Sequence, residues 1–369
     1  MFYDLQCDCG FFASVDFLYW YARETNLSYA LDVFGCAKDA GSSTSDVIFS
    51  AKSFKNLDTA WDPGFRVGIG WNDGCDGWDY YLNWTYIHNS EKSSISVPNT
   101  YALNGVSIFL PDVNEYALIN QWVNPGVFPT PGTSPDNLQP VTFDSIKAKW
   151  EMNLNWVDLE LGRKYWTSAC FNIRPYVGIR GLWNRVSFRT KGSRTSPLAA
   201  DVASAPLVFK DRFKTRMWGV GMTGGFQPAW YFCQNFVLFG NMDISLLWGE
   251  FEVKKKENYQ DINAISGETV NWDTSNAGHN SFFQMTPMLD VALGLRWEDT
   301  WCCDQYRSAF DVAWEHHTLF DQNHRFKLVD FFASEGGSTI RQGSGFRTFD
   351  EATGNLDLGG LVIRLRVDF

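Results

Sequence analysis

Few residues in this sequence have the types and spacing that covalent chemistry needs. The richest group is Glu315-His316-His317, because a carboxylate beside imidazoles could ligate a metal or support a nucleophile. The sequence has no Walker loop, no Gly-x-Ser-x-Gly elbow and no His-Glu-x-x-His pair to complete such a site. Successive residues of a strand point to opposite faces, so the two histidines are more simply one inward-facing residue and one rim residue. We therefore expect a protein that is not an enzyme, with no catalytic residue, no metal and no cofactor.

Eight cysteines form the other group with reactive side chains. One of them, Cys36, lies in a long loop of the layout described below, and the other seven lie near the N-terminus or at short turns. In an oxidising compartment such thiols could form disulfides, either within one rim or between neighbouring proteins. Cys7-x-Cys9 lacks the usual zinc spacing, and buried or free thiols are the alternative. The disulfide candidates are Cys7, Cys9, Cys75, Cys170, Cys233, Cys302 and Cys303.

Alternation of apolar and polar residues with period two runs through ten segments of the chain, and helical periodicity is almost absent. The last segment is the clearest, because its apolar residues share one face and its two arginines share the other. The phase slips at Trp156-Val157, and this slip predicts a β-bulge. The segments are 11–22, 65–72, 80–86, 149–161, 172–180, 218–223, 236–248, 284–297, 310–315 and 360–369.

Strand length and aromatic content favour a barrel in a membrane over a soluble sandwich or lectin. Several segments reach the ~9–11 residues that cross a bilayer at a tilt, whereas ordinary strands average ~5–6. Aromatic residues make up 17% of the chain and often end the apolar faces, as interface girdles do. The mean hydropathy is −0.24. A low mean is expected of a barrel, because every second strand residue faces water.

Short and long connections alternate along the chain, as they do in outer-membrane barrels. The short periplasmic turns, beside both termini, are expected at 72–78, 162–169, 226–233 and 298–305. The long extracellular loops are expected at 24–64, 89–146, 184–211, 250–280 and 321–357. The predicted fold is therefore all-β, a single domain over 1–369 that forms a transmembrane antiparallel up-and-down β-barrel. It has at least ten strands, and alternation inside the long loops leaves up to sixteen open.

The alternation assigns each strand residue to lipid or to the barrel interior. Charges of both signs on the interior faces could line a pore and tune its ion selectivity, or pair with one another and plug a small barrel. The residues expected to face lipid are Leu289, Val291, Leu293, Leu295, Leu361, Ile363, Leu365 and Phe369. The residues expected to line a pore are Arg66, Lys149, Glu151, Asp158, Glu160, Arg174, Arg180, Asp243, Asp290, Arg296, Asp311, Glu315, Arg364 and Arg366.

The charge balance and the N-terminus bear on partners and localisation. A net charge of −11 argues against a nucleic-acid partner, because binding phosphates needs a basic surface. The basic run Lys254-Lys255-Lys256 is expected in a solvated loop. The first residues lack the basic and apolar regions of a signal peptide. We therefore expect a mature chain, with its signal removed, in a bacterial outer membrane.

The first strand, Gly10-Phe11-Phe12-Ala13-Ser14-Val15-Asp16-Phe17-Leu18-Tyr19-Trp20, resembles the opening strand of the Legionella-type pore-forming outer-membrane proteins. That family includes the major-outer-membrane-protein-like porins of Chlamydia-related bacteria. The likeness spans nearly the whole chain through Asp158-Leu159-Glu160-Leu161-Gly162, Arg174-Pro175, Gly178-Ile179-Arg180-Gly181 and Trp218-Gly219-Val220-Gly221. The resemblance implies a pore without a catalytic site, and the cysteine-rich chlamydial branch implies disulfide-linked networks.

We therefore expect an outer-membrane porin that lets small hydrophilic solutes or ions diffuse through it. The alternative is a structural or adhesive outer-membrane protein with a plugged lumen, cross-linked into the envelope by disulfides. The expected partners are outer-membrane lipid, the solutes, and either further copies of the chain or disulfide-linked envelope proteins.

Overall fold

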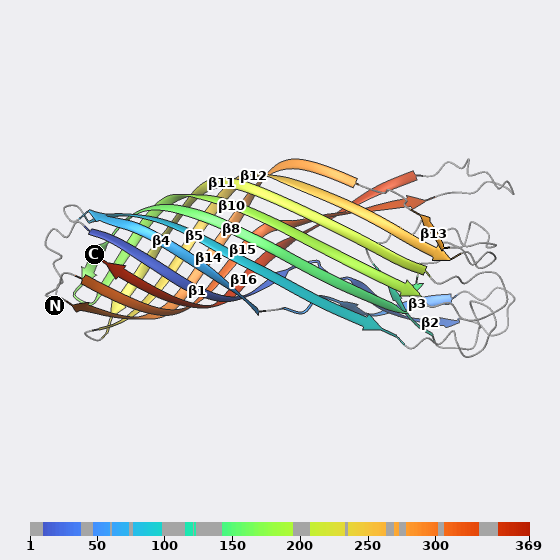
Figure 1. Cartoon of the computed structure of the whole chain (residues 1–369), viewed down its shortest axis with the longest axis horizontal. Helices are drawn as coiled ribbons and strands as arrows, with labels where there is room; N and C mark the ends of the chain where they lie inside the picture. Colours follow the sequence, from blue (N-terminus) through green and yellow to red (C-terminus); the bar gives the residue numbers. More distant parts are fainter. Residues whose placement is uncertain are drawn as a thin grey trace.

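Ten long antiparallel strands close into one barrel (Figure 1). Their order is β11-β10-β8-β5-β4-β1-β16-β15-β14-β12, and pairing of β11 with β12 completes the ring. These strands are β1 (Gly10–Glu24), β4 (Trp61–Asp73), β5 (Trp78–Ser96), β8 (Ser145–Arg163), β10 (Phe171–Arg194), β11 (Leu207–Tyr231), β12 (Phe236–Ile262), β14 (Gly278–Trp301), β15 (Tyr306–Phe331) and β16 (Phe346–Asp368). All ten segments expected from the alternation are strands of this ring.

The structure is a computed structural model, and its described part leaves out several connections. The described residues are 10–37, 47–59, 61–73, 77–97, 115–120, 122, 142–194, 207–232, 235–262, 269–272, 278–301, 306–331 and 346–369. Within these ranges, no helix is long and apolar enough to cross a membrane.

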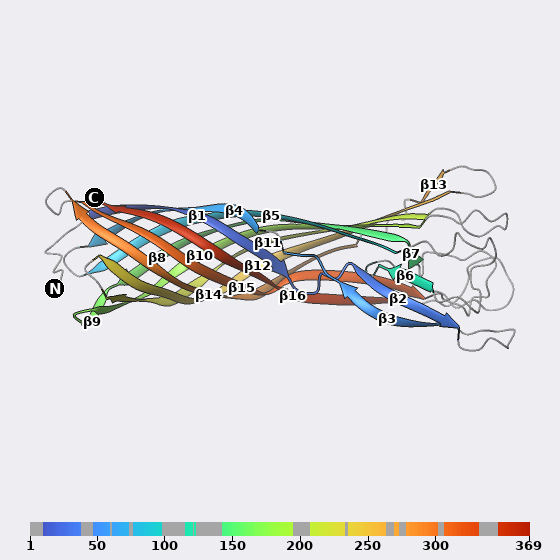
Figure 2. The ribbon, with the colours of Figure 1, turned by 90° about the horizontal axis from the view of Figure 1, so that it is seen from below.

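Among the described residues, six short strands accompany the ring. β9 (Tyr165–Ser168) pairs with β10, and β13 (Thr269–Trp272) pairs with β12. A separate sheet has the order β3-β2-β6-β7, from β2 (Ala30–Ala37), β3 (Val47–Lys55), β6 (Glu115–Ile119) and β7 (Thr142–Phe143). This small sheet lies at the end of the barrel opposite the start of β1 and the end of β16 (Figure 2).

The first and last strands close the barrel against each other. β1 pairs with β16 in continuous register from Phe12 opposite Asp368 to Glu24 opposite Leu356. The amide of Phe369 adds a hydrogen bond of 2.8 Å to the carbonyl of Phe11. A barrel in lipid has no water to satisfy an open strand edge, so this seam is the contact that such a chain must make.

Several strands run far past the length needed to cross a bilayer, and this corrects the expected loops. β11, β12 and β15 have 25, 27 and 26 residues. Much of 184–211, 250–280 and 321–357, expected as long loops, is therefore strand. The basic run Lys254-Lys255-Lys256 lies inside β12, where Lys255 is fully buried. Sequence alternation missed these extensions because the two faces of each strand change roles there. In the belt the outward side chains are apolar, whereas in the extensions the inward side chains are apolar and the outward ones are polar or charged.

β8 shows the exchange of polarity in one strand. Trp150, Met152, Leu154 and Trp156 point into the barrel and are buried, whereas Leu159 is exposed on the outer face. β8 pairs with both neighbours without any register shift, so the predicted bulge at Trp156-Val157 is wrong. The apolar side chains change face because the outer surface of the strand meets lipid at one end and water at the other.

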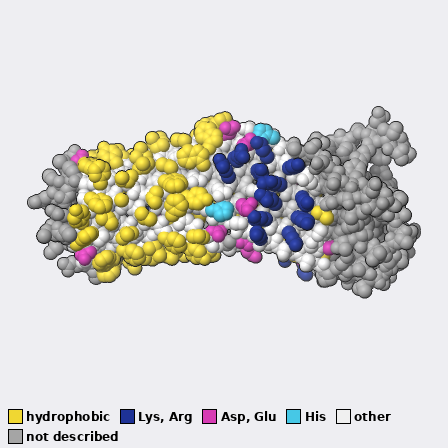
Figure 3. All heavy atoms as spheres, viewed as in Figure 1, with side chains coloured by type: hydrophobic (Ala, Val, Ile, Leu, Met, Phe, Trp, Pro, Cys, Tyr) yellow, Lys and Arg dark blue, Asp and Glu magenta, His cyan; other side chains and the backbone are white. Residues whose placement is uncertain are grey.

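An apolar belt covers the half of the barrel that holds the short turns, and a band of Lys and Arg follows it (Figure 3). Several exposed tryptophans lie along the belt's margins, as interface residues of membrane barrels do. Trp183, Trp218 and Trp248 lie on the side of the basic band, and Trp78 and Trp230 lie at the short turns.

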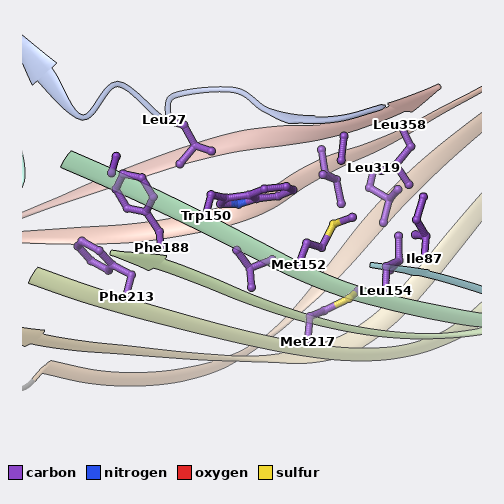
Figure 4. Close-up of a cluster of buried hydrophobic side chains, with 14 of the residues drawn as sticks. Leu27, Ile87, Trp150, Met152, Leu154, Phe188, Phe213, Met217, Leu319 and Leu358 are labelled. Atoms are coloured by element: carbon purple, nitrogen blue, oxygen red, sulfur yellow. The ribbon is translucent and has the colours of Figure 1, made fainter. Parts of the chain in front are cut away.

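Beyond the belt, the interior of the barrel is an apolar core. Its buried side chains include Trp150, Met152, Phe188, Phe213 and Met217, which point into the space that the strands enclose (Figure 4). The barrel is thus polar inside where it is apolar outside, and apolar inside where it is basic outside.

Candidate functional site

The interior of the belt half contains a connected group of charged side chains. The guanidinium of Arg66 on β4 lies 3.1 Å from a carboxylate oxygen of Asp16 on β1 and 2.8 Å from one of Glu315 on β15. The imidazole of His317 lies between two carboxylates, with Nε2 3.2 Å from Glu315 and Nδ1 2.7 Å from Asp290 on β14. These ion pairs join strands that lie on both sides of the seam between β1 and β16.

A second arginine continues this network across the barrel. Arg180 on β10 contacts Asp158 on β8 and Asp290, each at 2.5 Å, and Asp243 on β12 at 3.5 Å. Asp243 also accepts a hydrogen bond of 2.8 Å from the hydroxyl of Tyr176. The network therefore joins β1, β4, β8, β10, β12, β14 and β15 through the interior.

Two tryptophans complete this level. Trp20 on β1 and Trp156 on β8 stack with ring centroids 5.9 Å apart, and the ring of His317 lies 4.6 Å from Trp20 and 5.5 Å from Trp156. The Arg66 guanidinium lies 5.7 Å from the Trp20 ring. Trp20 is 0% exposed and Trp156 is 1% exposed. These side chains are buried inside the barrel, and we call them, with Arg180, Glu315 and Asp290, the central layer.

Below the central layer, towards the short turns, the interior is polar and partly wet. Arg364 contacts Asp16 at 2.8 Å, and Arg296 contacts Asp311 at 2.8 Å. Arg366 reaches Asp368 at 2.6 Å, and Arg307 pairs with Glu298. The four arginine side chains are between 20% and 26% exposed. The interior at this end is therefore partly accessible to solvent.

Above the central layer, a segment of chain folds into the barrel mouth. The indole of Trp122 donates a hydrogen bond of 2.9 Å to the carbonyl of Ser28, and its own carbonyl accepts one of 2.8 Å from Lys255. Asn120 donates a hydrogen bond of 2.8 Å to the hydroxyl of Thr190. These contacts fix Asn120 and Trp122 to the inner wall of β10 and β12, where Trp122 is buried.

A buried ion pair anchors the apolar core beneath that segment. Glu24 accepts hydrogen bonds of 3.0 Å from both the indole of Trp150 and the guanidinium of Arg325. Arg325 lies 4.2 Å from the ring centre of Phe188. Burial raises the pKa of Glu24 above its usual value, although Arg325 opposes that shift. Burial also lowers the pKa of Arg325, to about 10.

The structure places most of the expected site residues where the alternation put them. The eight residues expected to face lipid point outward, and Leu293 is exposed on the outer face. Lys149 and Glu151 are the corrections, because they lie outside the barrel, where they pair with each other and Glu151 also pairs with Arg189. The assumed bulge had placed them inside. The other charged residues of the set point into the interior, and Arg174 there pairs with Asp79 and Glu160.

The cysteine prediction stays open. Cys170 lies at the turn between β9 and β10, where its thiol is free and exposed. The other disulfide candidates lie outside the described residues: Cys7, Cys9, Cys75, Cys233, Cys302 and Cys303.

Sequence reasoning missed the aromatic part of the central layer. Trp20 lies on the polar face of its strand, beside Leu18, and such a position marks an interior apolar contact. The phase slip at Trp156-Val157 was the second signal. The sequence pattern predicted a bulge at this slip instead.

Comparisons with known proteins give the family. The family described as the Legionella pneumophila major outer membrane protein precursor matches residues 8–369. The search of curated proteins found no match. Among solved structures, the outer membrane protease OmpT from Escherichia coli is 12% identical, with 98% of this chain and 97% of that chain covered and a TM-score of 0.36. A Pseudomonas aeruginosa FadL homologue is 8% identical, with 99% and 91% covered and a TM-score of 0.23.

These structural likenesses are too low to support a statement about function. The family match covers nearly the whole chain, and the closed barrel with its apolar belt agrees with it. The chain is therefore an outer-membrane protein, and it belongs to the family of the Legionella pneumophila major outer membrane protein.

Proposed function

We propose that this chain is a structural protein of the outer membrane whose barrel interior is closed to free diffusion of solutes. The observation that supports this proposal is the central layer, in which Trp20, Trp156, Arg66, Arg180 and His317 are all less than a tenth exposed. A water-filled pore would leave its lining charges hydrated rather than enclosed by one another.

The energetics of the central layer also favour closure. A buried charge is costly unless it is paired and hydrogen-bonded, and removal of one partner leaves the other uncompensated. Arg180 contacts three carboxylates at once. If its side chain moved away, all three carboxylates would lose this cationic partner. Barrels of this size are narrow enough for long side chains to fill the interior.

Diffusion of small hydrophilic solutes is the second candidate, and the wet end of the interior favours it. Arg296, Arg307, Arg364 and Arg366 are partly exposed beside carboxylates, which is the mixed lining expected of a selective pore. Passage would require the central layer to move, and with it Asn120 and Trp122.

Conductance in planar bilayers tests the proposal. The folded full chain should insert without lasting current steps. A variant with Arg66→Ala and Arg180→Ala should conduct, because it removes both cations and much of the side-chain volume of the central layer. The matched control is Arg185→Ala with Arg216→Ala, which changes two exposed arginines of the outer face and should leave the barrel closed.

Folding of each variant is checked by the mobility of unheated samples on a gel. Steady current steps from the unmodified chain would contradict the proposal and support the pore. A folded Arg66 and Arg180 variant that stays closed would contradict the role given to the central layer.

A further inference from the structure

A hollow on the outer surface of the barrel is lined by basic side chains. Its volume is about 670 Å³, and it lies over β5, β8, β10, β11 and β12. The carboxyl group that contributes to its lining is that of Asp211, whose side chain is buried towards the interior. The hollow is part of the basic band that follows the apolar belt in Figure 3.

Strand register aligns five of these cations in one transverse row. Lys149 is the register partner of both Lys92 and Arg189, Arg189 is the partner of Arg212, and Arg212 is the partner of Lys256. Neighbouring strands lie about 4.8 Å apart, so the row spans about 19 Å around the barrel.

The next row outward has a related composition. Its members are register partners in the order Ser94, Lys147, Lys191, Lys210 and Asn258. Three cations therefore lie between a hydroxyl and an amide, and all of these positions also line the hollow. The two rows combine point charges with groups that can bind sugar hydroxyls.

Like charges directly opposite each other across strands destabilise a sheet. Repulsion by Arg212 is the main cause that lowers the pKa of the nearby Lys214. Acidic residues of this face already pair with some of its cations: Glu151 pairs with Lys149 and Arg189, and Glu252 pairs with Lys254, Arg216 and His279.

Three cations of the row, Lys92, Arg212 and Lys256, have no ion pair among the described residues. A row of cations with this repulsion suits an anionic ligand that carries more than one charge.

The position of the hollow identifies the source of that ligand. The exposed rings of Trp183 and Trp218 mark the margin of the apolar belt on β10 and β11. Arg189 and Arg212 lie on the same outer face of the same strands. Each is six residues away from its tryptophan, on the side away from the short turns. A lipid whose chains cover the belt would hold its headgroup at this level. The belt half carries the short turns, so this headgroup belongs to the outer leaflet.

We propose that the hollow binds the phosphorylated sugar headgroup of an outer-leaflet glycolipid. The row from Lys92 to Lys256 holds the phosphates, with the guanidiniums of Arg189 and Arg212 each able to donate two hydrogen bonds to one phosphate. The second row contacts the sugar through Ser94 and Asn258. The occupant is held beside the barrel wall, and its binding does not depend on whether the interior conducts.

Binding to defined lipids tests this inference. The folded full chain is titrated with vesicles of phosphatidylcholine that contain lipid A with two phosphates, lipid A with one phosphate, or phosphatidylglycerol. Affinity should be highest for the diphosphorylated glycolipid. A variant with Arg189→Gln, Arg212→Gln and Lys256→Gln should bind it at least tenfold more weakly, since it loses several charge-assisted hydrogen bonds.

The matched control removes the same charge elsewhere on the molecule. Arg23→Gln, Lys52→Gln and Arg163→Gln lie outside the hollow and should change affinity by less than about twofold. Equal loss in both variants, or equal affinity for phosphatidylglycerol, would overturn the inference in favour of unspecific charge attraction. Inorganic phosphate is added as a competitor, and full displacement by it at millimolar concentration would show a phosphate site without lipid recognition.

Discussion

The indole rings of Trp20 and Trp156 stack inside the barrel with their centroids 5.9 Å apart. They come from β1 and β8, which are separated in the ring by β4 and β5. On one side they contact His317 of the charged network, and on the other they belong to the apolar core. The pair thus lies at the boundary between the polar and the apolar interior.

Trp156→Ala should destabilise the folded barrel by about 3–5 kcal/mol, because a large buried ring leaves a cavity that the closed wall cannot fill. Urea unfolding in lipid vesicles measures the change. Trp183→Ala, on the outer face of β10, is the control and should cost less, because lipid can occupy the space. An equal cost for both would contradict the interior position of Trp156.

Leu293→Arg should cost about 2–4 kcal/mol if its position is near the middle of the bilayer. Leu293 is exposed within the apolar belt of β14. Ser281→Arg is the control on the same face of the same strand, since Ser281 lies in the basic band and already contacts Glu250. Vesicle-based unfolding should find little change for this control.

The neighbouring Gly294 cannot serve as that control. It is buried, and a Cβ there would lie 2.6 Å from the Cβ of Ala313 and 2.7 Å from the carbonyl of Val312. Any side chain at this position would therefore disturb the pairing of β14 with β15. A large effect of Ser281→Arg would contradict the boundary drawn between belt and basic band.

Deletion of Val367–Phe369 should prevent barrel closure. The three residues supply the pairing of Asp368 with Phe12 and of Val367 with Ala13, and the amide of Phe369 bonds to Phe11. Their loss leaves backbone groups of β1 unsatisfied in lipid. The measurement is the folded fraction on unheated gels, with Phe369→Ala as the control that keeps the backbone. Normal folding of the deletion would contradict the seam.

The sequence predicted ten strands of the ring and the faces of their lipid-spanning parts, because lipid outside and water or charge inside impose a strict alternation. It left the total open, at up to sixteen strands. It did not predict the extensions beyond the belt. In β12, Phe251 and Val253 are buried whereas Lys254 and Lys256 are exposed, which is ordinary alternation with the faces exchanged. Unless the position of the boundary between the apolar belt and the basic band is known, the same pattern suggests a loop or a bulge.

The central layer was predictable in its charges and not in its partners. Alternation placed Arg66 and Arg180 inside, yet nothing local indicates that Arg66 meets Glu315 or that Arg180 meets Asp290. Those contacts join strands that lie far apart in the chain, so they depend on the strand order and register of the closed barrel.

Cys170 should be accessible to a maleimide reagent in the folded chain, since its thiol is free and exposed. If disulfides cross-link this rim in native membranes, labelling of Cys170 should rise after reduction, and non-reducing gels should show oligomers that a reductant removes. Cys170→Ser is the control for the label. Full labelling without a reductant would exclude Cys170 from any cross-link.

Asp211 should make the stability of the apolar core depend on pH. It is buried on β11, and burial raises its pKa to about 8, with Lys255 opposing the shift and Glu257 adding to it. An aspartate in an unfolded chain releases its proton near pH 4. Between about pH 4 and pH 8 the folded chain therefore holds a proton that the unfolded chain has lost, and its contribution to stability falls as the pH rises through this window.

Asp211→Asn, a neutral side chain of the same shape, isolates this contribution. The variant should match the unmodified chain near pH 5 and exceed its free energy of unfolding at pH 9 by on the order of 1–3 kcal/mol. Urea unfolding followed by tryptophan fluorescence at both pH values measures the difference. Asp58→Asn is the control at an exposed position and should show no such change with pH. A constant difference between Asp211→Asn and the unmodified chain at both pH values would contradict a protonated Asp211.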